Sequence, residues 1–214
     1  MKFHGYFRSS ASYRLRIALA LKNIPHEKTS VHLSRGGGEQ FKPEFHKLNP
    51  QDLVPVVEDD GHVLTQSLAI LEYLEETHPQ PAILPKAPAD RARVRALSQI
   101  IACEMHPLNN LRVLNYLTKD LGVSEDAKLK WYRHWIALGF DAVEALLAGH
   151  PQTGKFCHGD TPTMADICLV PQVFNARRFD CPMEAYPTVV RIHDACQALP
   201  AFAESVPAKQ FDAE

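Results

Sequence analysis

The pattern of apolar and polar residues at the start of the chain predicts a strand, a helix and a second strand. Residues 3–7 predict a short strand that ends before Arg8. Between Ser12 and Lys22 apolar side chains recur at helical spacing, and Asn23 can end that helix. The loosely alternating stretch 28–33 predicts a second strand. This order is typical of the start of a parallel α/β unit.

A hairpin and a helix are expected next. Two short β-rich runs, Leu53–Glu58 and His62–Thr65, flank an Asp-Gly turn, which is a strong hairpin signal. Leucines then follow at helical spacing from position 68, and Ser67 is the natural N-cap of that helix. The first part of the chain therefore reads βαβ, then ββα.

Two stretches have the composition of connections. Residues 34–39 contain three consecutive glycines and predict a flexible loop. Neither a GxGxxG nor a GK[ST] pattern follows the glycines, so a phosphate-binding loop is not expected. Prolines at 79, 81, 85 and 88 mark a connector over 78–88.

Beyond the connector only helices are expected. Apolar periodicity predicts one long helix across 89–118 and a second one carrying apolar residues from 129 to 147. Thr163-Met-Ala-Asp166 forms a capping-box pattern that opens a helix to about 176, and a last helix spans 188–199. The predicted fold class is α/β followed by all-α, with domains at 1–82 and 89–214.

Composition and charge exclude several classes of function. A net charge of -2 and no basic patch argue against nucleic acid or an anionic membrane as partner. No apolar run approaches the ~18 residues of a membrane span, and no secretory signal is recognised, so a cytoplasmic protein is expected. The five cysteines show no CxxC spacing, which favours reduced thiols and no metal.

Several short motifs carry a resemblance that covers nearly the whole chain. The most specific are the serine-rich run Phe7-Arg-Ser-Ser-Ala-Ser-Tyr-Arg and the run Met164-Ala-Asp-Ile-Cys-Leu-Val-Pro-Gln-Val. Further matches are Leu48-Asn-Pro, Leu53-Val-Pro, Gln66-Ser-Leu-Ala-Ile and His106-Pro-Leu-Asn-Asn. Together with the predicted order of elements, these motifs resemble the zeta class of glutathione transferases.

The resemblance implies both a fold and an activity. It implies a thioredoxin-like glutathione-binding domain followed by an all-helical substrate-binding domain, in a homodimer. The class contains maleylacetoacetate isomerases, which make fumarylacetoacetate in tyrosine and phenylalanine breakdown with glutathione as cofactor. Alternatives are a maleylpyruvate isomerase of gentisate degradation, a general conjugating transferase and, least expected, a non-catalytic glutathione-binding protein.

Cis–trans isomerisation of a conjugated diacid requires a soft nucleophile that adds to the double bond and leaves again, and a thiolate suits this task. Lowering a thiol pKa by two units needs about 2.7 kcal/mol, which a hydroxyl hydrogen bond and a helix N-terminus can supply together. By resemblance Ser9 is the main donor to the thiolate and Ser10 its helper, whereas Ser12 suits a plain helix cap. Ala11 stands where the family usually has cysteine, so the nucleophile must come from glutathione.

Further residues of the expected glutathione site follow from the resemblance. Val54-Pro55 is expected to be a cis-proline turn that faces the cysteinyl part of glutathione. Gln66 and Ser67 at a helix start can hold the γ-glutamyl carboxylate. Gln40 is placed at the glycyl end.

The helical half contributes the remaining candidates. His106 and Asn110 are spaced i, i+4 and are expected to share one face of the long helix toward the cleft. Because the substrate is a dicarboxylate, arginines are the natural anchors. The resemblance suggests Arg8, Arg112 and Arg178, in preference to Arg177. In several other transferase classes a tyrosine near the end of the first strand takes the serine's role, but Tyr6 of this chain is expected to belong to the core.

Overall fold

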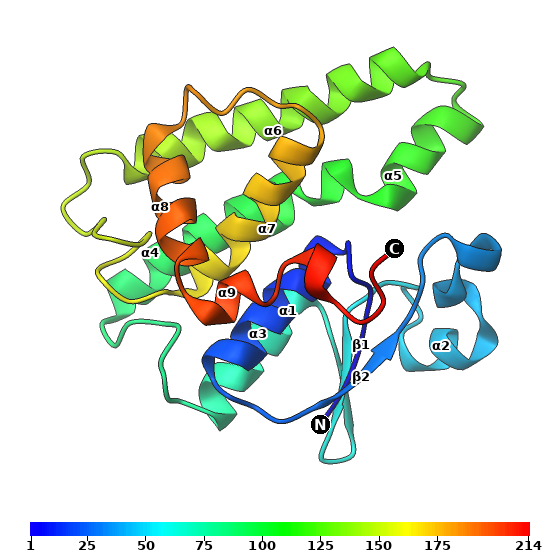
Figure 1. Cartoon of the computed structure of the whole chain (residues 1–214), viewed down its shortest axis with the longest axis horizontal. Coiled ribbons are helices and arrows are strands. Elements are labelled where there is room, and N and C mark those ends of the chain that lie inside the picture. The colour runs from blue at the N-terminus through cyan, green and yellow to red at the C-terminus, as the bar shows by residue number, and fades with distance from the viewer. The chain divides into compact units, whose positions relative to one another are not determined.

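The computed structural model describes residues 1–214, which divide into two compact units (Figure 1). The first contains Met1–Ala82 together with Leu199–Glu214, and the second contains Ile83–Ala198. The predicted domains, 1–82 and 89–214, assign the last segment to the helical part. That division stays a prediction.

The first unit is built on a four-stranded sheet with the order β2-β1-β3-β4. Strands β1 (Lys2–Gly5) and β2 (Glu27–Ser30) are parallel, so the connection between them must cross over through a helix. Strands β3 (Val56–Asp59) and β4 (His62–Thr65) form the predicted hairpin, and β3 runs antiparallel to β1. The predicted βαβ-ββα order is confirmed.

Helices cover both faces of this sheet (Figure 1). Helices α1 (Ser10–Leu21) and α3 (Ser67–Thr77) pack together on one face. On the other side lies α2 (Pro43–Leu48), which was not predicted because six residues are too few to show a helical period. The glycine-rich stretch forms two 3₁₀ turns, Arg35–Gly37 and Glu39–Phe41.

The second unit contains helices and no strand, as predicted. In chain order its elements are α4 (Pro88–Gln99), a π-helical segment (Ile100–Met105), a 3₁₀ turn (Pro107–Asn109), α5 (Leu111–Asn115), a second π-helical segment (Tyr116–Asp120), α6 (Glu125–Leu147), α7 (Met164–Arg178) and α8 (Pro187–Gln197). Helix α9 (Pro200–Ala203) and a 3₁₀ turn (Pro207–Lys209) follow in the first unit. No helix in the structure combines the length and apolarity needed to cross a membrane.

The single long helix predicted across 89–118 is wrong. Pro107 cannot donate a backbone hydrogen bond and crowds the preceding turn, so the α-helix gives way to a π-helical segment and a 3₁₀ turn. Asn110 then has extended backbone (φ -69°, ψ 147°). His106 and Asn110 therefore do not share a helical face.

The capping box at the start of α7 is confirmed. The carboxylate of Asp166 accepts hydrogen bonds from the Thr163 backbone N–H (2.7 Å) and hydroxyl (2.8 Å). Its other oxygen accepts from the backbone N–H of Cys157 (2.8 Å), nine residues earlier. Asp166 is fully buried, so this one side chain joins the helix start to the loop before it.

Candidate functional site

The turn between β1 and α1 carries the predicted serines. Ser9 is the N-cap of α1, and its hydroxyl oxygen accepts a hydrogen bond from the Ser12 backbone N–H (3.2 Å). The helix thus begins at Ser10, two residues before the predicted start. The role of cap assigned to Ser12 is wrong, because Ser12 lies inside the helix and accepts from the Tyr6 N–H (3.3 Å).

Its position as the N-cap allows the Ser9 hydroxyl to donate a hydrogen bond to a thiolate. Because the Ser9 oxygen already accepts the Ser12 N–H, its own hydroxyl hydrogen is left to donate outward. Ser9 is half-buried, whereas Ser10 is 5% exposed and interacts within the chain. The half-buried Ala11 offers no polar group. Of the two predicted serines, Ser9 is the better placed to meet a ligand at the helix N-terminus.

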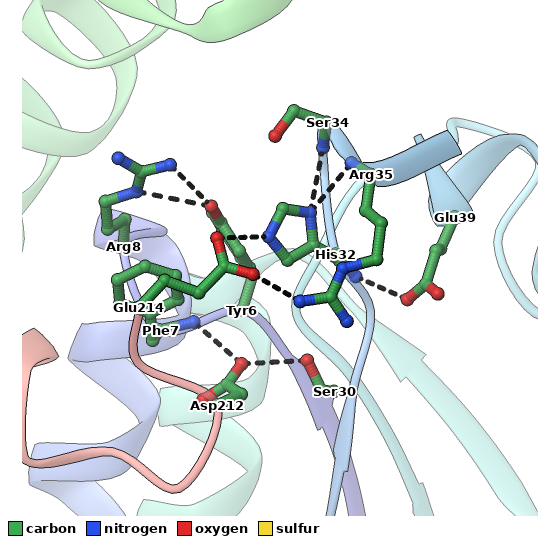
Figure 2. Close-up of polar contacts among 10 residues, drawn as sticks. All are labelled: Tyr6, Phe7, Arg8, Ser30, His32, Ser34, Arg35, Glu39, Asp212 and Glu214. Carbon is green, nitrogen blue, oxygen red and sulfur yellow. Dashed lines mark hydrogen bonds and ion pairs between the residues drawn. The ribbon is translucent and has the colours of Figure 1, made fainter. Parts of the chain in front are cut away.

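Arg8 lies in the same turn and forms no ion pair with an acidic residue. Its guanidinium donates to the Tyr6 hydroxyl (2.8 and 3.2 Å; Figure 2) and lies 5.0 Å from the centre of the Phe7 ring. Tyr6 is 5% exposed, which confirms that it belongs to the core. Tyr6 therefore orients an exposed arginine whose positive charge is available to an anion.

Gln40 lies in a close-fitting polar position. It is 6% exposed, and its side-chain N–H donates to the Leu33 carbonyl (3.3 Å) while its Oε1 has no partner. Gly38 packs against it with φ +112°, and a Cβ there would lie 2.7 Å from the Gln40 amide nitrogen. The glycine therefore makes room for the amide, and the free acceptor suits a ligand N–H.

Replacing Gly38 with Ala is expected to displace the Gln40 amide and to weaken glutathione binding by about tenfold, a loss of ~1.4 kcal/mol. Isothermal titration calorimetry with glutathione measures this change. Gly36→Ala is the matched control, since Gly36 also has positive φ (+60°) but open space around it. Equal weakening by both substitutions would mean that loop strain, and not the Gln40 contact, governs binding.

The turn before β3 contains the predicted cis peptide bond between Val54 and Pro55, which is confirmed. Both residues are buried. Val54 packs in one apolar cluster with Tyr6, Phe7 and Val56. The structure thus brings the cis-proline turn against the turn that carries Arg8 and Ser9.

The start of α3 differs by one residue from the prediction. Ile70 donates its backbone N–H to the Gln66 carbonyl (3.0 Å), so Gln66 is the N-cap and Ser67 the first helical residue. Ser67 as the cap is therefore wrong. Gln66 has φ +66°, a strained backbone for a residue other than glycine. Its side chain donates to Gln51 Oε1 (2.6 Å).

Replacing Gln66 with Gly is expected to raise stability while lowering glutathione affinity. Relief of a positive φ gains ~1–3 kcal/mol, and the greater freedom of glycine in the unfolded chain removes ~0.5–1 kcal/mol of that. Asn23→Gly, at φ +52°, serves as control. It should raise the denaturation midpoint without changing the Kd for glutathione. A stabilised Gln66→Gly variant of unchanged affinity would show that the strain serves no binding role.

Arg14 belongs to this site but was not predicted. It lies on α1, is 1% exposed, and donates from Nη1 to the Ser67 hydroxyl (3.2 Å). A buried cation behind a helix N-terminus strengthens an anion site there. The available signal was a pair of arginines, Arg14 and Arg16, on a helix whose other side chains are mostly apolar and buried.

The remaining candidates lie in the second unit. Asn110 caps α5 by accepting from the Arg112 N–H (3.1 Å), and His106 is bonded within the chain at the break after the π-helical segment. Arg112 and Arg178 are exposed, and neither pairs with an acid; Arg178 lies over the Phe179 ring at 5.1 Å.

The neighbouring Arg177, in contrast, pairs with Asp194 (3.6 Å). An arginine already neutralised within the chain is a poorer carboxylate anchor. This difference favours Arg178 over Arg177, in the order that the sequence suggested.

Comparison with known proteins now identifies the family. Residues 8–77 match the model of the glutathione S-transferase N-terminal domain, and residues 136–203 match that of the C-terminal domain. The chain is 51% identical over 210 residues to a probable maleylacetoacetate isomerase of Vibrio cholerae, covering 98% of this chain and 97% of that protein. It belongs to the glutathione S-transferase family.

Other relatives place this glutathione transferase in the zeta class. It is 50% identical over 212 residues to a maleylpyruvate isomerase of Ralstonia sp, covering 99% of both chains. A solved zeta-class maleylpyruvate isomerase superposes with a TM-score of 0.97 at 48% identity over the full length of both chains. A maleylacetoacetate isomerase from Methylobacterium extorquens, solved with malonate and glutathione bound, gives 0.96 at 41% over the full length of both.

The side chains in the first unit of this zeta-class transferase are chemically suited to bind glutathione. The Ser9 hydroxyl suits a thiolate, the start of α3 beside Arg14 suits a carboxylate, and Gln40 Oε1 is a buried acceptor without a partner. Glutathione carries a thiol, carboxylates and amides among its polar groups, and these three kinds have a matching group in this unit.

Proposed function

We propose that this chain isomerises the maleyl double bond of maleylacetoacetate to the fumaryl form with glutathione as cofactor. The observation that carries the proposal is the Ser9 hydroxyl, which accepts from Ser12 at the N-terminus of α1 and so keeps its hydrogen for an anionic acceptor. When bound, glutathione supplies a thiolate that adds reversibly to the double bond. The chain need only ionise that thiol and hold the substrate.

The residues of the first unit divide this work. Ser9 donates to the thiolate and lowers the pKa of the thiol, aided by the helix N-terminus. Gln66 and Ser67, backed by Arg14, hold the γ-glutamyl carboxylate, and Gln40 holds the glycyl end. Val54 presents its backbone at the cis-proline turn to the cysteinyl part of the cofactor. Ser10, buried next to Ser9, is the helper that the resemblance suggests.

Three arginines are proposed to bind the substrate's carboxylates: Arg8, Arg112 and Arg178. They are supported by their lack of acidic partners and by the malonate and citrate found in structures of related isomerases. His106 and Asn110 are proposed to contribute at the break before α5, where π-helical backbone is often functional.

The test compares turnover of maleylacetoacetate, maleylpyruvate and a neutral conjugation substrate. Arg8→Ala, Arg112→Ala and Arg178→Ala should each lower isomerisation of the dicarboxylates far more than conjugation. Arg177→Ala is the matched control, because this residue is paired with Asp194. Equal losses on charged and neutral substrates would contradict the arginine assignment. A preference for maleylpyruvate would favour the second function, since relatives of both activities are about equally similar.

Two further properties are proposed. A homodimer is proposed from the resemblance to the family, and analytical ultracentrifugation measures it. A cytoplasmic location is proposed from the cysteine pattern, since the five cysteines are free and four of them are buried.

A further inference from the structure

The segment after α9 folds back onto the sheet of the first unit and reaches the β1–α1 turn (Figures 1 and 2). The Gln210 side chain donates to the carbonyls of Glu204 and Val206 (both 3.0 Å), which turns the backbone. The cavity between this segment and β1, lined by Phe3 and Phe211 among others, is about 10 Å³. A space of that size holds at most one water, so the segment packs closely.

Asp212 links this segment to the β1–α1 turn by hydrogen bonds. One carboxylate oxygen, Oδ2, accepts from the Phe7 backbone N–H (3.1 Å) and from the Ser30 hydroxyl (2.8 Å; Figure 2). Phe7 lies two residues before Ser9, and Ser30 is the last residue of β2. A single side chain thus joins the end of β2 to the turn that presents the serine.

Arg16 also contacts this turn. Its guanidinium, 6% exposed, donates to the carbonyls of Tyr6 (3.4 Å), Phe7 (2.9 Å) and Ser205 (3.0 Å). Burial lowers the pKa of Arg16 to about 10, against the opposing effects of Tyr13 and the Asp212 carboxylate. The backbone of Phe7 is therefore held at its N–H by the Asp212 carboxylate and at its carbonyl by the Arg16 guanidinium.

Glu214 reaches the neighbouring loop through His32. Nδ1 of His32 accepts from the backbone N–H groups of Arg35 (2.8 Å) and Ser34 (3.3 Å), so the ring proton lies on Nε2 and points at Glu214 (3.3 Å; Figure 2). Glu214 also pairs with the Arg35 side chain. That pair is exposed, so His32, 5% exposed, is the effective link.

We propose that Asp212 and Glu214 are positioning residues of the glutathione site. Asp212 sets the β1–α1 turn, and through it the direction of the Ser9 hydroxyl. Glu214, through His32, sets the loop that leads to Gln40. The inference rests on the proposed function, because it assumes that Ser9 meets a thiolate. The two residues should affect different steps, ionisation for Asp212 and binding for Glu214.

The test for Asp212 is the pKa of the thiol of bound glutathione, followed by thiolate absorbance at 240 nm. Asp212→Ala should raise that pKa by about one unit and lower kcat near neutral pH by about tenfold, with little change in KM for glutathione. Asp212→Asn keeps an acceptor for the Phe7 N–H and should restore most of the loss. If the alanine variant does not fold, Asp212→Asn replaces it: a smaller but measurable rise of the thiol pKa supports the positioning role, and no rise contradicts it.

Glu214→Ala should instead raise the KM for glutathione several-fold and leave kcat and the thiol pKa unchanged. Glu204→Ala is the matched control for both variants, because Glu204 lies on the same segment and pairs only with the exposed Lys209 through its side chain. It should leave the thiol pKa, kcat and KM as in the parent protein.

Two outcomes separate this inference from the proposed function. Folded Asp212 variants with an unchanged thiol pKa would overturn the positioning role and leave the isomerase function standing. A parent protein that ionises glutathione but turns over neither maleyl substrate would overturn the function, while a raised thiol pKa in Asp212→Ala would still support the positioning role.

Discussion

Replacing Ser9 with Ala is expected to raise the pKa of the bound glutathione thiol by about one to two units and to lower isomerase turnover by about 10- to 100-fold. A hydrogen bond to a charged group contributes ~1.5–3 kcal/mol, and one pKa unit corresponds to 1.36 kcal/mol. Thiolate absorbance at 240 nm as a function of pH measures the first effect, and initial rates with maleylacetoacetate and maleylpyruvate measure the second.

The double role of Ser9 requires controls that separate capping from catalysis. Alanine at an N-cap costs ~0.5–2 kcal/mol of stability, whereas glycine costs only a few tenths relative to serine. Ser9→Gly should therefore lose as much activity as Ser9→Ala while keeping nearly all of the stability. Ser124, whose hydroxyl caps α6 by accepting from Ala127, provides the converse control. Ser124→Ala should lose stability and retain activity.

The result that contradicts the assignment is equally specific. If Ser9→Gly retains turnover and a low thiol pKa, Ser9 is only a cap and another group must donate to the thiolate. Tyr6 would not be the first alternative, because its side chain is buried in the core.

The sequence predicted those elements that depend on a few neighbouring residues. The Asp-Gly hairpin, the crossover helix of the βαβ unit and the Thr163–Asp166 capping box each depend on a few neighbouring residues, and each is confirmed. The helix break at Pro107 was missed because apolar periodicity continues past it, although the proline itself was a visible signal.

The parts of the site that could not be predicted depend on contacts between distant residues. Asp212 meets Phe7 across 205 positions, and Arg14 meets Ser67 across 53. Neither contact leaves a periodic or spaced signal in the sequence. The strained φ of Gln66 likewise follows from the tertiary structure, since no glycine marks that position. Of these residues only Gln66 and Ser67 were predicted as part of the site, from a family motif; Arg14 lies in another of the quoted motifs, but its role was not predicted.

Replacing Asp166 with Ala is expected to cause the largest loss of stability in the chain. Three strong donors, the Thr163 N–H and hydroxyl and the Cys157 N–H, and the weaker Cys196 thiol would be left buried without this acceptor. Each unsatisfied group costs ~1–3 kcal/mol, and partial relaxation brings the total to about 3–5 kcal/mol. For a chain of this length that lowers the Tm by roughly 6–20 °C, which scanning calorimetry measures.

Asp166→Asn tests whether the hydrogen-bond acceptors of Asp166 or its buried charge have the larger effect on stability. Asparagine is neutral and avoids the cost of a buried charge, but its amide nitrogen would face N–H or O–H donors in place of one carboxylate oxygen. If the acceptors dominate, this variant should also be destabilised, by about 2–4 kcal/mol. A variant as stable as the parent would show instead that the cost of burying the charge cancels its hydrogen bonds.

The pH dependence gives a second test of the same carboxyl. Burial raises the pKa of Asp166, and its hydrogen bonds to Cys157 and Thr163 offset only part of that rise. The folded chain therefore holds the proton more tightly than the unfolded chain. This contribution to stability is fully present below the ordinary pKa of an aspartate and is lost as the pH rises through the raised folded value. The stability difference between the parent and Asp166→Asn should accordingly widen as the pH is lowered through that window. Denaturant titrations at a series of pH values measure it, and a difference that narrows instead would mean that the hydrogen bonds outweigh burial and that the folded pKa lies below the ordinary value.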